Sequence, residues 1–393
     1  MASPQPIKVL LLSPHGAGEH YHGAGTTFFR MYSKLDPNEA QVTLLHGSVA
    51  QRPSVTYQET VNVGEIGNGA FSQRNFIKNA KAWIRDNIES FDVLHSTMGY
   101  QIAMEPTHYA QSLGCPCVLT ISSHQRDLGG HASLPSRILG LPRKRQKMAR
   151  ELSAMIATSQ SIYDELVTVG VEKDRIARIP YGVDIDRFHP CEANQRQELR
   201  AELGLADTIT FVFVGYIHRR KRPHLLVEAM GLIKQELGES PFQVVFVGPH
   251  DDPEYMNEIK NMGSENEVSQ HVHWAGFTKN VELYFRASDV FVLPSEGEGL
   301  PNAMLEAMSC GLPILGTRIS GILDLVDGER NGFLVDPNAS SLAEKMRRYC
   351  EDAKLLRQHG QNARDFIESQ YSAQSVLNQY LELFRKVISE TKY

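Results

Sequence analysis

The sequence predicts two doubly wound α/β domains in tandem, each built on a parallel sheet. The chain has 393 residues, which is longer than a single hydrophobic core usually grows. Short runs rich in Val, Ile and Leu alternate with longer amphipathic segments throughout, as they do in βαβ units. The runs 211–214 and 244–247 are continuously apolar, which is typical of parallel strands covered on both faces.

Each domain is expected to have its own series of strands. We predict an N-terminal Rossmann-like domain over 1–188 and a C-terminal one over 189–372, joined within the Pro- and Gly-containing segment 180–190. Segment 373–393 is predicted to be a helix whose apolar face packs back toward the N-terminal domain. The strands are expected at Lys8–Ser13, Val42–Leu45, Val93–His95, Val118–Ile121, Met155–Thr158, Thr210–Val214, Val244–Val247, His271–Trp274, Val290–Leu293, Ile314–Gly316 and Gly332–Val335.

Charge and composition exclude several classes of protein. The net charge is −6, and it is uneven, because residues 1–190 carry 19 Lys+Arg against 17 Asp+Glu while the remainder carries 21 against 29. This acidic second half argues against nucleic acid as the main partner. No apolar run approaches the ~20 residues of a membrane span, and the opening apolar run is too short for a signal peptide. We therefore expect a cytoplasmic protein.

One loop carries most of the chemical information. The segment FVLPSEGEGLPNAMLEAMSCG (291–311) joins a buried strand to a helix through Gly and Glu. Pro301 is predicted at the first helical position, where its missing N–H costs nothing. The N–H groups of Asn302, Ala303, Met304 and Leu305 would then point out of the helix start and offer a positive site for a diphosphate.

Two carboxylates of this segment could flank a ligand at the helix start. Glu306 suits the two vicinal hydroxyls of a ribose, a role that acidic residues have in dinucleotide sites, which leaves Glu298 nearer a sugar. An arbitrary pair of glutamates is more often solvated at the surface. The neighbouring Gly297 and Gly299 and the buried strand favour a binding loop instead.

In these features the chain resembles glycosyltransferase family 4, the retaining enzymes of the GT-B fold, whose signature is two glutamates separated by seven residues. Glu298 and Glu306 meet that signature. The resemblance implies transfer of a hexosyl unit from a nucleotide diphosphate sugar, UDP favoured over GDP, to a glycan, lipid-linked or small-molecule hydroxyl, without a metal or other cofactor. Further agreement lies in IATSQS (156–161), IPYGVDIDRFHP (179–190), FVFVGYIHRRK (211–221) and VDGERNGFLVDP (326–337).

The resemblance also assigns cations to the donor diphosphate. Lys221 lies where the family has a lysine that contacts the pyrophosphate. The arginine that normally follows the strand-ending glycine, here Gly215, is replaced by Tyr216, so either Arg219 or Arg220 would supply its charge. Fixed cations stabilise a departing diphosphate more than the bound ground state. Without the family pattern, the basic run 219–222 would be read as an exposed loop.

Other positions are carried over from the family pattern. Gly23 and Gly25 would let backbone N–H groups approach the diphosphate, although this loop lacks the lysine of a P-loop and does not complete G-x-G-x-x-G. His124 matches a histidine close to the transferred sugar, whereas a single histidine is more often structural. Thr278 would lie by the nucleotide base.

Three alternatives remain open at this stage. The segment 137–150, with its six basic residues, could lie on the inner face of an anionic membrane or could be a solvated helix face. A nucleotide-sugar epimerase or hydrolase of the same fold would use the same donor site without an acceptor. A two-domain binding protein would bind its ligand without turnover.

Overall fold

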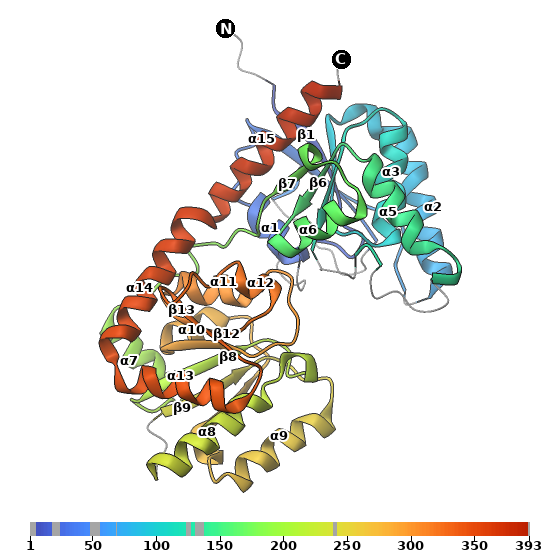
Figure 1. Cartoon of the computed structure of the whole chain (residues 1–393). Coiled ribbons are helices and arrows are strands. Elements are labelled where there is room, and N and C mark those ends of the chain that lie inside the picture. Colours follow the sequence, from blue (N-terminus) through green and yellow to red (C-terminus); the bar gives the residue numbers. More distant parts are fainter. Residues whose placement is uncertain are drawn as a thin grey trace. The chain divides into compact units, whose positions relative to one another are not determined.

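The computed structural model describes residues 5–17, 24–47, 56–67, 69–122, 127–129, 137–238 and 242–391. The chain divides into two compact units. Unit 1 comprises Met1–Gly182 together with Ala373–Tyr393, and unit 2 comprises Val183–Ser372 (Figure 1). Each unit is a parallel sheet between helices, so the predicted fold class is confirmed.

The sheet of unit 1 has seven strands in the order β3-β2-β1-β4-β5-β6-β7. Five of them lie where apolar runs predict strands. The outer strands β3 and β7 were not predicted, and both lie at sheet edges, where a strand needs no continuous apolar run. The bounds are β1 Ile7–Leu12, β2 Ala40–His46, β3 Glu59–Asn62, β4 Val93–Ser96, β5 Cys117–Ile121, β6 Ala154–Ala157 and β7 Ile176–Arg178.

Helices cover both faces of this sheet. On one face α3 contacts both α2 and α5, and on the other α1 contacts the C-terminal helix α15 (Figure 1). The helices are α1 Ala24–Tyr32, α2 Ala70–Asn87, α3 Gln101–Ser112, α5 Leu141–Glu151, α6 Gln160–Val169 and α15 Ala373–Thr391.

A buried histidine helps to fix α15 on unit 1. His95 of β4 is 0% exposed, and its ring nitrogens lie 2.8 Å from the Tyr32 hydroxyl and 2.9 Å from Thr120 Oγ1. Thr120 Oγ1 is in turn 3.3 Å from the hydroxyl of Tyr380 on α15. Burial lowers the pKa of His95 to about 3, so the ring is neutral at ordinary pH. Polar groups thus link β4, β5, α1 and α15 within one core.

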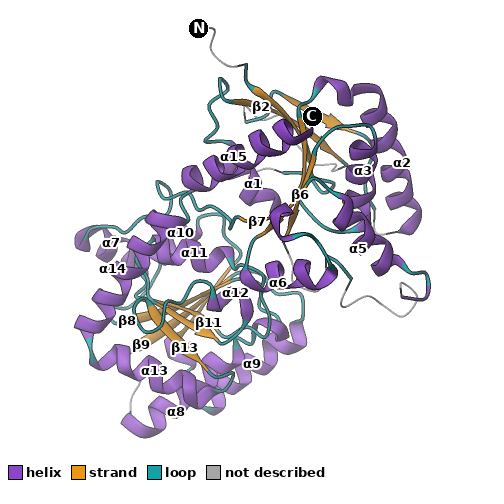
Figure 2. Ribbon diagram, turned by 45° about the horizontal axis from the view of Figure 1, so that its top comes forward, coloured by secondary structure: helices purple, strands orange, loops and turns teal. Residues whose placement is uncertain are grey.

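Unit 2 contains a six-stranded parallel sheet in the order β10-β9-β8-β11-β12-β13 (Figure 2). Helices α8, α9 and α13 cover one face, and α7, α10, α11 and α14 cover the other. The bounds are β8 Ile209–Val214, β9 Phe242–Val247, β10 Val272–Gly276, β11 Val290–Leu293, β12 Ile314–Thr317, β13 Gly332–Val335, α7 Ala193–Glu202, α8 His224–Leu237, α9 Pro253–Glu265, α10 Val281–Ala287, α11 Asn302–Ser309, α12 Ser320–Leu323, α13 Ala339–Glu351 and α14 Ala353–Gln370.

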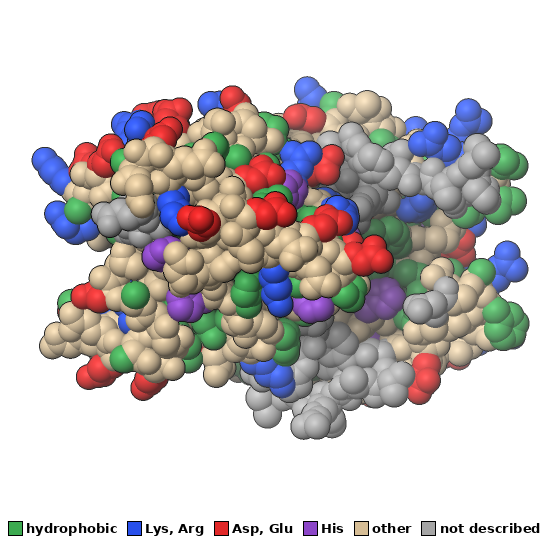
Figure 3. Space-filling model, turned by 90° about the horizontal axis from the view of Figure 1, so that it is seen from below, with side chains coloured by type: hydrophobic (Ala, Val, Ile, Leu, Met, Phe, Trp, Pro, Cys, Tyr) green, Lys and Arg blue, Asp and Glu red, His purple; other side chains and the backbone are tan. Residues whose placement is uncertain are grey.

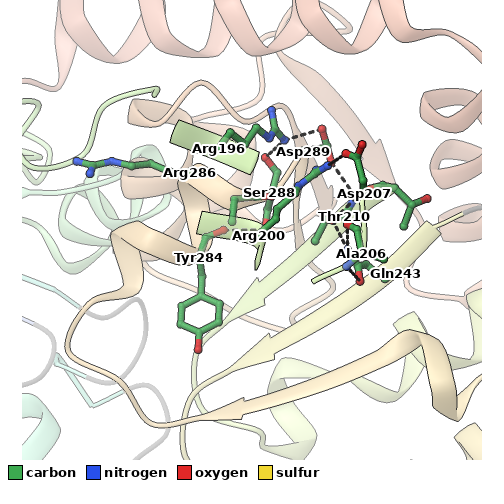
Figure 4. Close-up of polar contacts among 12 residues, drawn as sticks. Arg196, Arg200, Ala206, Asp207, Thr210, Gln243, Tyr284, Arg286, Ser288 and Asp289 are labelled. Carbon is green, nitrogen blue, oxygen red and sulfur yellow. Dashed lines mark hydrogen bonds and ion pairs between the residues drawn. The ribbon is translucent and has the colours of Figure 1, made fainter. Parts of the chain in front are cut away.

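An ion-pair network attaches α7 to the start of β11 (Figure 4). Asp289 Oδ1 lies 2.6 Å from Arg196 Nη2, and its Oδ2 lies 2.6 Å from Arg200 Nη2. Oδ2 also accepts the Thr210 N–H at 2.8 Å, which adds β8 to the network. The Asp289 side chain is 14% exposed, so its charge depends on these donors.

On the surface drawn in Figure 3, acidic and basic side chains are interspersed. Within the described part of the chain, no helix is both long enough and apolar enough to cross a bilayer.

Candidate donor site

The strand order of unit 2 marks one place where a ligand crevice is expected. The chain runs from β8 outward to β9 and β10, then returns to β11 on the other side of β8. In such sheets, ligands bind beyond the carboxyl ends of the strands at this reversal. The loops that follow β8 and β11, together with the start of α11, carry all the site residues predicted for this unit except Thr278.

Glycines allow the loops after β8 and β9 to approach each other. A Cβ atom on Gly248 would lie 2.0 Å from the Gly215 carbonyl oxygen, so a side chain there would displace the β8 loop. Gly215 itself has a φ of +150°, a backbone conformation that side chains disfavour. The loop then forms a short 3-10 turn, Arg219–Lys221, which stops at Arg222 with φ 50°.

Charged side chains from the loop after β8 and the loop after β11 meet at Glu298. Its Oε1 atom lies 2.7 Å from Lys221 Nζ and 3.7 Å from Arg220 Nη1. The side chains of Glu298 and Lys221 are only 10% and 17% exposed. Oε1 is buried and accepts no hydrogen bond of good geometry from the described residues, so charge rather than an aligned hydrogen bond holds it. This arrangement is not the solvated surface pair that an arbitrary glutamate and lysine would form.

The structure separates the two arginines that the sequence left open. Arg219 points to α9, where it pairs with Glu258 at 2.6 Å and lies over the Tyr255 ring at 4.6 Å. Arg220 instead donates through Nη1 to the Gly297 carbonyl, and its own carbonyl accepts the Glu296 N–H at 2.8 Å. Arg220 is therefore the arginine beside Lys221 and Glu298.

The start of α11 differs from the sequence prediction. The helix begins at Asn302, and Pro301 is its N-cap residue with φ −76° and ψ 108°, not its first helical residue. This backbone turns the Pro301 carbonyl into the helix, where it accepts the N–H groups of Met304 at 3.0 Å and Leu305 at 3.3 Å. The prediction that these two amides are free is wrong. Among the described residues, no partner is found for the Ala303 N–H.

The last residue of β12 and the segment after it contact the loop that carries Glu298. Thr317 Oγ1 donates to the Ser295 carbonyl at 2.5 Å. Ser320 Oγ donates to the Glu298 carbonyl at 3.3 Å. A Cβ atom on Gly321 would lie only 1.4 Å from the Gly299 carbonyl oxygen. These three contacts were not predicted; the available signal in the sequence was two hydroxyls and a glycine at and just after the end of a neighbouring strand.

The remaining predicted residues lie farther along these elements or in unit 1. Glu306 is half-buried on α11. Thr278 follows β10, and its Oγ1 accepts the Asn280 N–H at 3.1 Å. Gly25 is in the first turn of α1 in unit 1. Gly23 and His124 lie outside the described residues.

Two family models match the chain. The model described as glycosyl transferases group 1 matches 195–366, and that of glycosyltransferase family 4 matches 21–187. An Escherichia coli UDP-Gal:alpha-D-GlcNAc-diphosphoundecaprenol alpha-1,3-galactosyltransferase is 33% identical over 54% of this chain and 55% of its own length. A D-inositol 3-phosphate glycosyltransferase of Paenarthrobacter aurescens is 27% identical over 63% of this chain and 62% of its own. The chain thus matches little more than half the length of these relatives.

Solved structures share the fold over nearly the whole chain. Anabaena HepE in complex with UDP superposes with a TM-score of 0.80 at 16% identity, covering 97% of this chain and 100% of that one. Sucrose-phosphate synthase of Thermosynechococcus elongatus gives a TM-score of 0.78 at 21% identity, with coverages of 98% and 100%. At these identities the likeness shows the fold alone, which is that of two Rossmann-like domains.

Proposed function

The chain belongs to glycosyltransferase family 4, and from this premise we propose that it transfers a hexosyl unit from a nucleotide diphosphate sugar to a hydroxyl acceptor with retention of configuration. The observation that carries the proposal is the cluster of Lys221, Arg220 and Glu298 at the strand reversal of unit 2, in which the Glu298 side chain is only 10% exposed. UDP is the favoured donor nucleotide, because the Anabaena neighbour is described in complex with UDP and the E. coli relative is named for UDP-Gal.

Each member of the cluster has a role in this proposal. Lys221 and Arg220 stabilise the negative charge that develops on the departing diphosphate. Glu298 holds the two cations in place before the donor binds and then accepts hydrogen bonds from hydroxyls of the sugar. The Ala303 N–H, at the start of α11, adds a backbone donor for the diphosphate. Because two side-chain cations supply this charge, the reaction is proposed to need no metal.

The other assignments follow the family pattern. Glu306 would bind the ribose hydroxyls and Thr278 the base. Gly23 and Gly25 would approach the diphosphate through backbone N–H groups, and His124 would contact the transferred sugar. No carboxylate nucleophile is assigned, so retention is proposed to proceed by same-face substitution in which the leaving diphosphate helps to deprotonate the acceptor hydroxyl.

A screen of UDP-, GDP- and ADP-sugars by calorimetry and by product analysis tests the proposal. We expect a UDP-sugar to bind, and Glu306→Ala to weaken that binding by about tenfold, as expected for loss of a charged hydrogen bond. Asp251→Ala, an exposed carboxylate after β9, is the control. Donor turnover that ignores every acceptor and yields an isomerised sugar would favour the epimerase alternative. Binding without any turnover would favour a binding protein.

A second proposal concerns a membrane surface. Ile138 and Leu139 are 77% and 73% exposed directly before α5, whose residues Arg143, Lys144 and Lys147 are also exposed. An apolar tip beside basic side chains is suited to an anionic bilayer. We expect Ile138→Asp with Leu139→Asp to reduce co-sedimentation with phosphatidylglycerol vesicles, whereas Leu237→Asp, 46% exposed on unit 2, should not. Equal sedimentation of all three proteins would contradict this contact.

A further inference from the structure

A second strand reversal, in unit 1, also contains a cavity. The chain runs from β1 outward to β2 and β3 and returns to β4 on the other side of β1. A pocket of about 350 Å³ lies beside the elements that follow these two strands. This volume is at the small end of the range for ligand pockets, and strand reversals are among their preferred positions. Its lining comes from His15 after β1, from Tyr100, Gln101 and Ile102 at the start of α3, and from Gln73, Leu141 and Arg145.

Arg145 is a buried cation whose donors are mostly unused. Its residue surface is 8% exposed. Nη1 donates to the Asp127 carbonyl at 2.9 Å, and Nε is buried without a partner among the described residues. In the same pocket, Gln101 Oε1 is also buried without a partner. Buried polar groups left unpaired cost stability, so these two indicate a ligand that offers an acceptor to Arg145 and a hydroxyl donor to Gln101.

The Asp127 carboxylate offsets part of the Arg145 charge, but no carboxylate of the described residues forms an ion pair with the Arg145 N–H groups. Asp127 Oδ2 instead accepts the Ser122 N–H at 2.8 Å and the Ser122 hydroxyl at 3.3 Å. The hydrogen bond between Asp127 and Arg145 uses the Asp127 backbone carbonyl, not its carboxylate. Glu105 of α3 accepts from Gln101 and pairs with Lys144 at 2.7 Å, so its charge is compensated on the other side of α5.

The start of α3 supplies a second source of positive potential. This helix has 12 residues, and the N–H groups of Ala103 and Met104 donate to the Tyr100 carbonyl. The Tyr100 carbonyl thus already pairs these two amides, and the contribution of the helix start is its dipole, whose positive end lies at the same end of α3 as Gln101. A planar guanidinium beside such a turn matches the geometry of a phosphate, which it can bind through two N–H groups at once.

We propose that this pocket binds a phosphate group of the acceptor, with Arg145 as its principal ligand. The inference rests on the proposed transferase function and narrows the acceptor to a phosphorylated molecule. That molecule is either a water-soluble phosphate ester or a lipid with a phosphate headgroup, because both present the same oxygens to the guanidinium.

Calorimetric titration of the full chain with inorganic phosphate, in the presence of saturating UDP to occupy the donor site, tests the pocket. We expect Arg145→Gln to weaken phosphate binding by at least about tenfold, since a charged hydrogen-bonding partner is lost. The phosphate affinity of Arg145→Lys should lie between those of the unchanged protein and Arg145→Gln. Lysine keeps the positive charge but lacks the planar pair of N–H groups of the guanidinium. Arg85→Gln is the matched control, as it removes the same charge from an exposed position in the last turn of α2. UDP affinity should be the same in all four proteins.

Competition then identifies the source of the phosphate. Glucose 6-phosphate that displaces inorganic phosphate indicates a soluble acceptor, and displacement by phosphatidylglycerol vesicles alone indicates a lipid headgroup. Displacement by neither overturns the proposal, as does unchanged phosphate affinity in Arg145→Gln. Should that variant fail to fold, Leu141→Trp, which fills the cavity from α5, must weaken phosphate binding instead. Absence of UDP binding with Arg145-dependent phosphate binding intact would reject the donor proposal and leave this pocket standing.

Discussion

Gly321→Ala is expected to disable the loop that carries Glu298 without touching a charged group. Gly321 lies in α12, and its Cα faces the backbone of Gly299, the residue after Glu298. The added Cβ would lie 1.4 Å from the Gly299 carbonyl oxygen and 2.4 Å from the carbonyl carbon. Both atoms belong to the backbone, so no flexible side chain can move aside to make room.

The size of the effect follows from that overlap. Ordinary contact between nonbonded heavy atoms is about 3.5 Å, so the loop or α12 must move by about 2 Å. Displacements of about 1 Å at a reacting centre can cost about a hundredfold in rate. We therefore expect kcat/KM to fall by at least about a hundredfold. Overpacking a well-packed site also costs stability, typically about 1 to 3 kcal/mol.

Kinetics and thermal denaturation, measured together, distinguish a displaced loop from a loss of fold. Donor turnover of Gly321→Ala should be low at temperatures where circular dichroism shows a folded protein. Gly69→Ala is the control, because a Cβ at Gly69 meets nothing within 4 Å. Wild-type kcat/KM together with wild-type Tm in Gly321→Ala would show that the Gly299 backbone does not depend on this contact.

Four further results are expected. Lys221→Ala should lower kcat by about a hundredfold or more and change UDP affinity much less, because its charge acts mainly on the leaving diphosphate; equal losses in both would contradict that role. Turnover should survive EDTA, and a loss restored by Mg²⁺ would refute metal independence. Asp289→Ala should lower the free energy of unfolding in urea by about 3 kcal/mol, because two arginines lose their buried partner. A change under about 1 kcal/mol would show that water replaces the lost carboxylate. The pKa of His95 is lowered to about 3 from 6.5. Its contribution to the free energy of unfolding is therefore complete above about pH 6.5 and is lost as pH falls toward 3, by up to about 1.4 kcal/mol per pH unit. Urea unfolding between about pH 7 and pH 5 should show this slope, and His95→Asn should reduce it.

Sequence patterns located the strands that are buried on both faces and the two edge strands of unit 2, β10 and β13, but missed the edge strands of unit 1, β3 and β7. β8 and β9 are continuous apolar runs because helices cover them on both sides. β3 has the sequence ETVN and no fully buried residue, and β7 is three residues long. Their positions depend on pairing with β2 and β6 rather than on their own composition. The local sequence of β3 and β7 therefore does not predict a strand.

The start of α11 shows a similar limit at the level of one residue. Proline favours the first helical position, and that preference placed Pro301 inside the helix. The observed ψ of 108° instead makes it the residue before the helix, which consumes two of the amides predicted to be free. The family pattern assigned Lys221 and Glu298 to the same donor site, but their ion pair was not predicted, since 76 residues of sequence separate them. Spacing along the chain does not encode which loops face each other.

A separate role for Arg145 was not predicted, because it lies among other basic residues in the sequence. Within the basic run 137–150 it was one of six cations, and the run as a whole indicated either a solvated face or a membrane contact. The helix α5 buries Arg145, Met148 and Ala149 and exposes Arg143, Lys144 and Lys147. Arg145 therefore occupies the apolar stripe, at the i, i+3 and i+4 spacing of a core-facing position. A charge on that stripe is costly unless something pairs with it, so its position on the helix, rather than the number of cations around it, was the signal to follow.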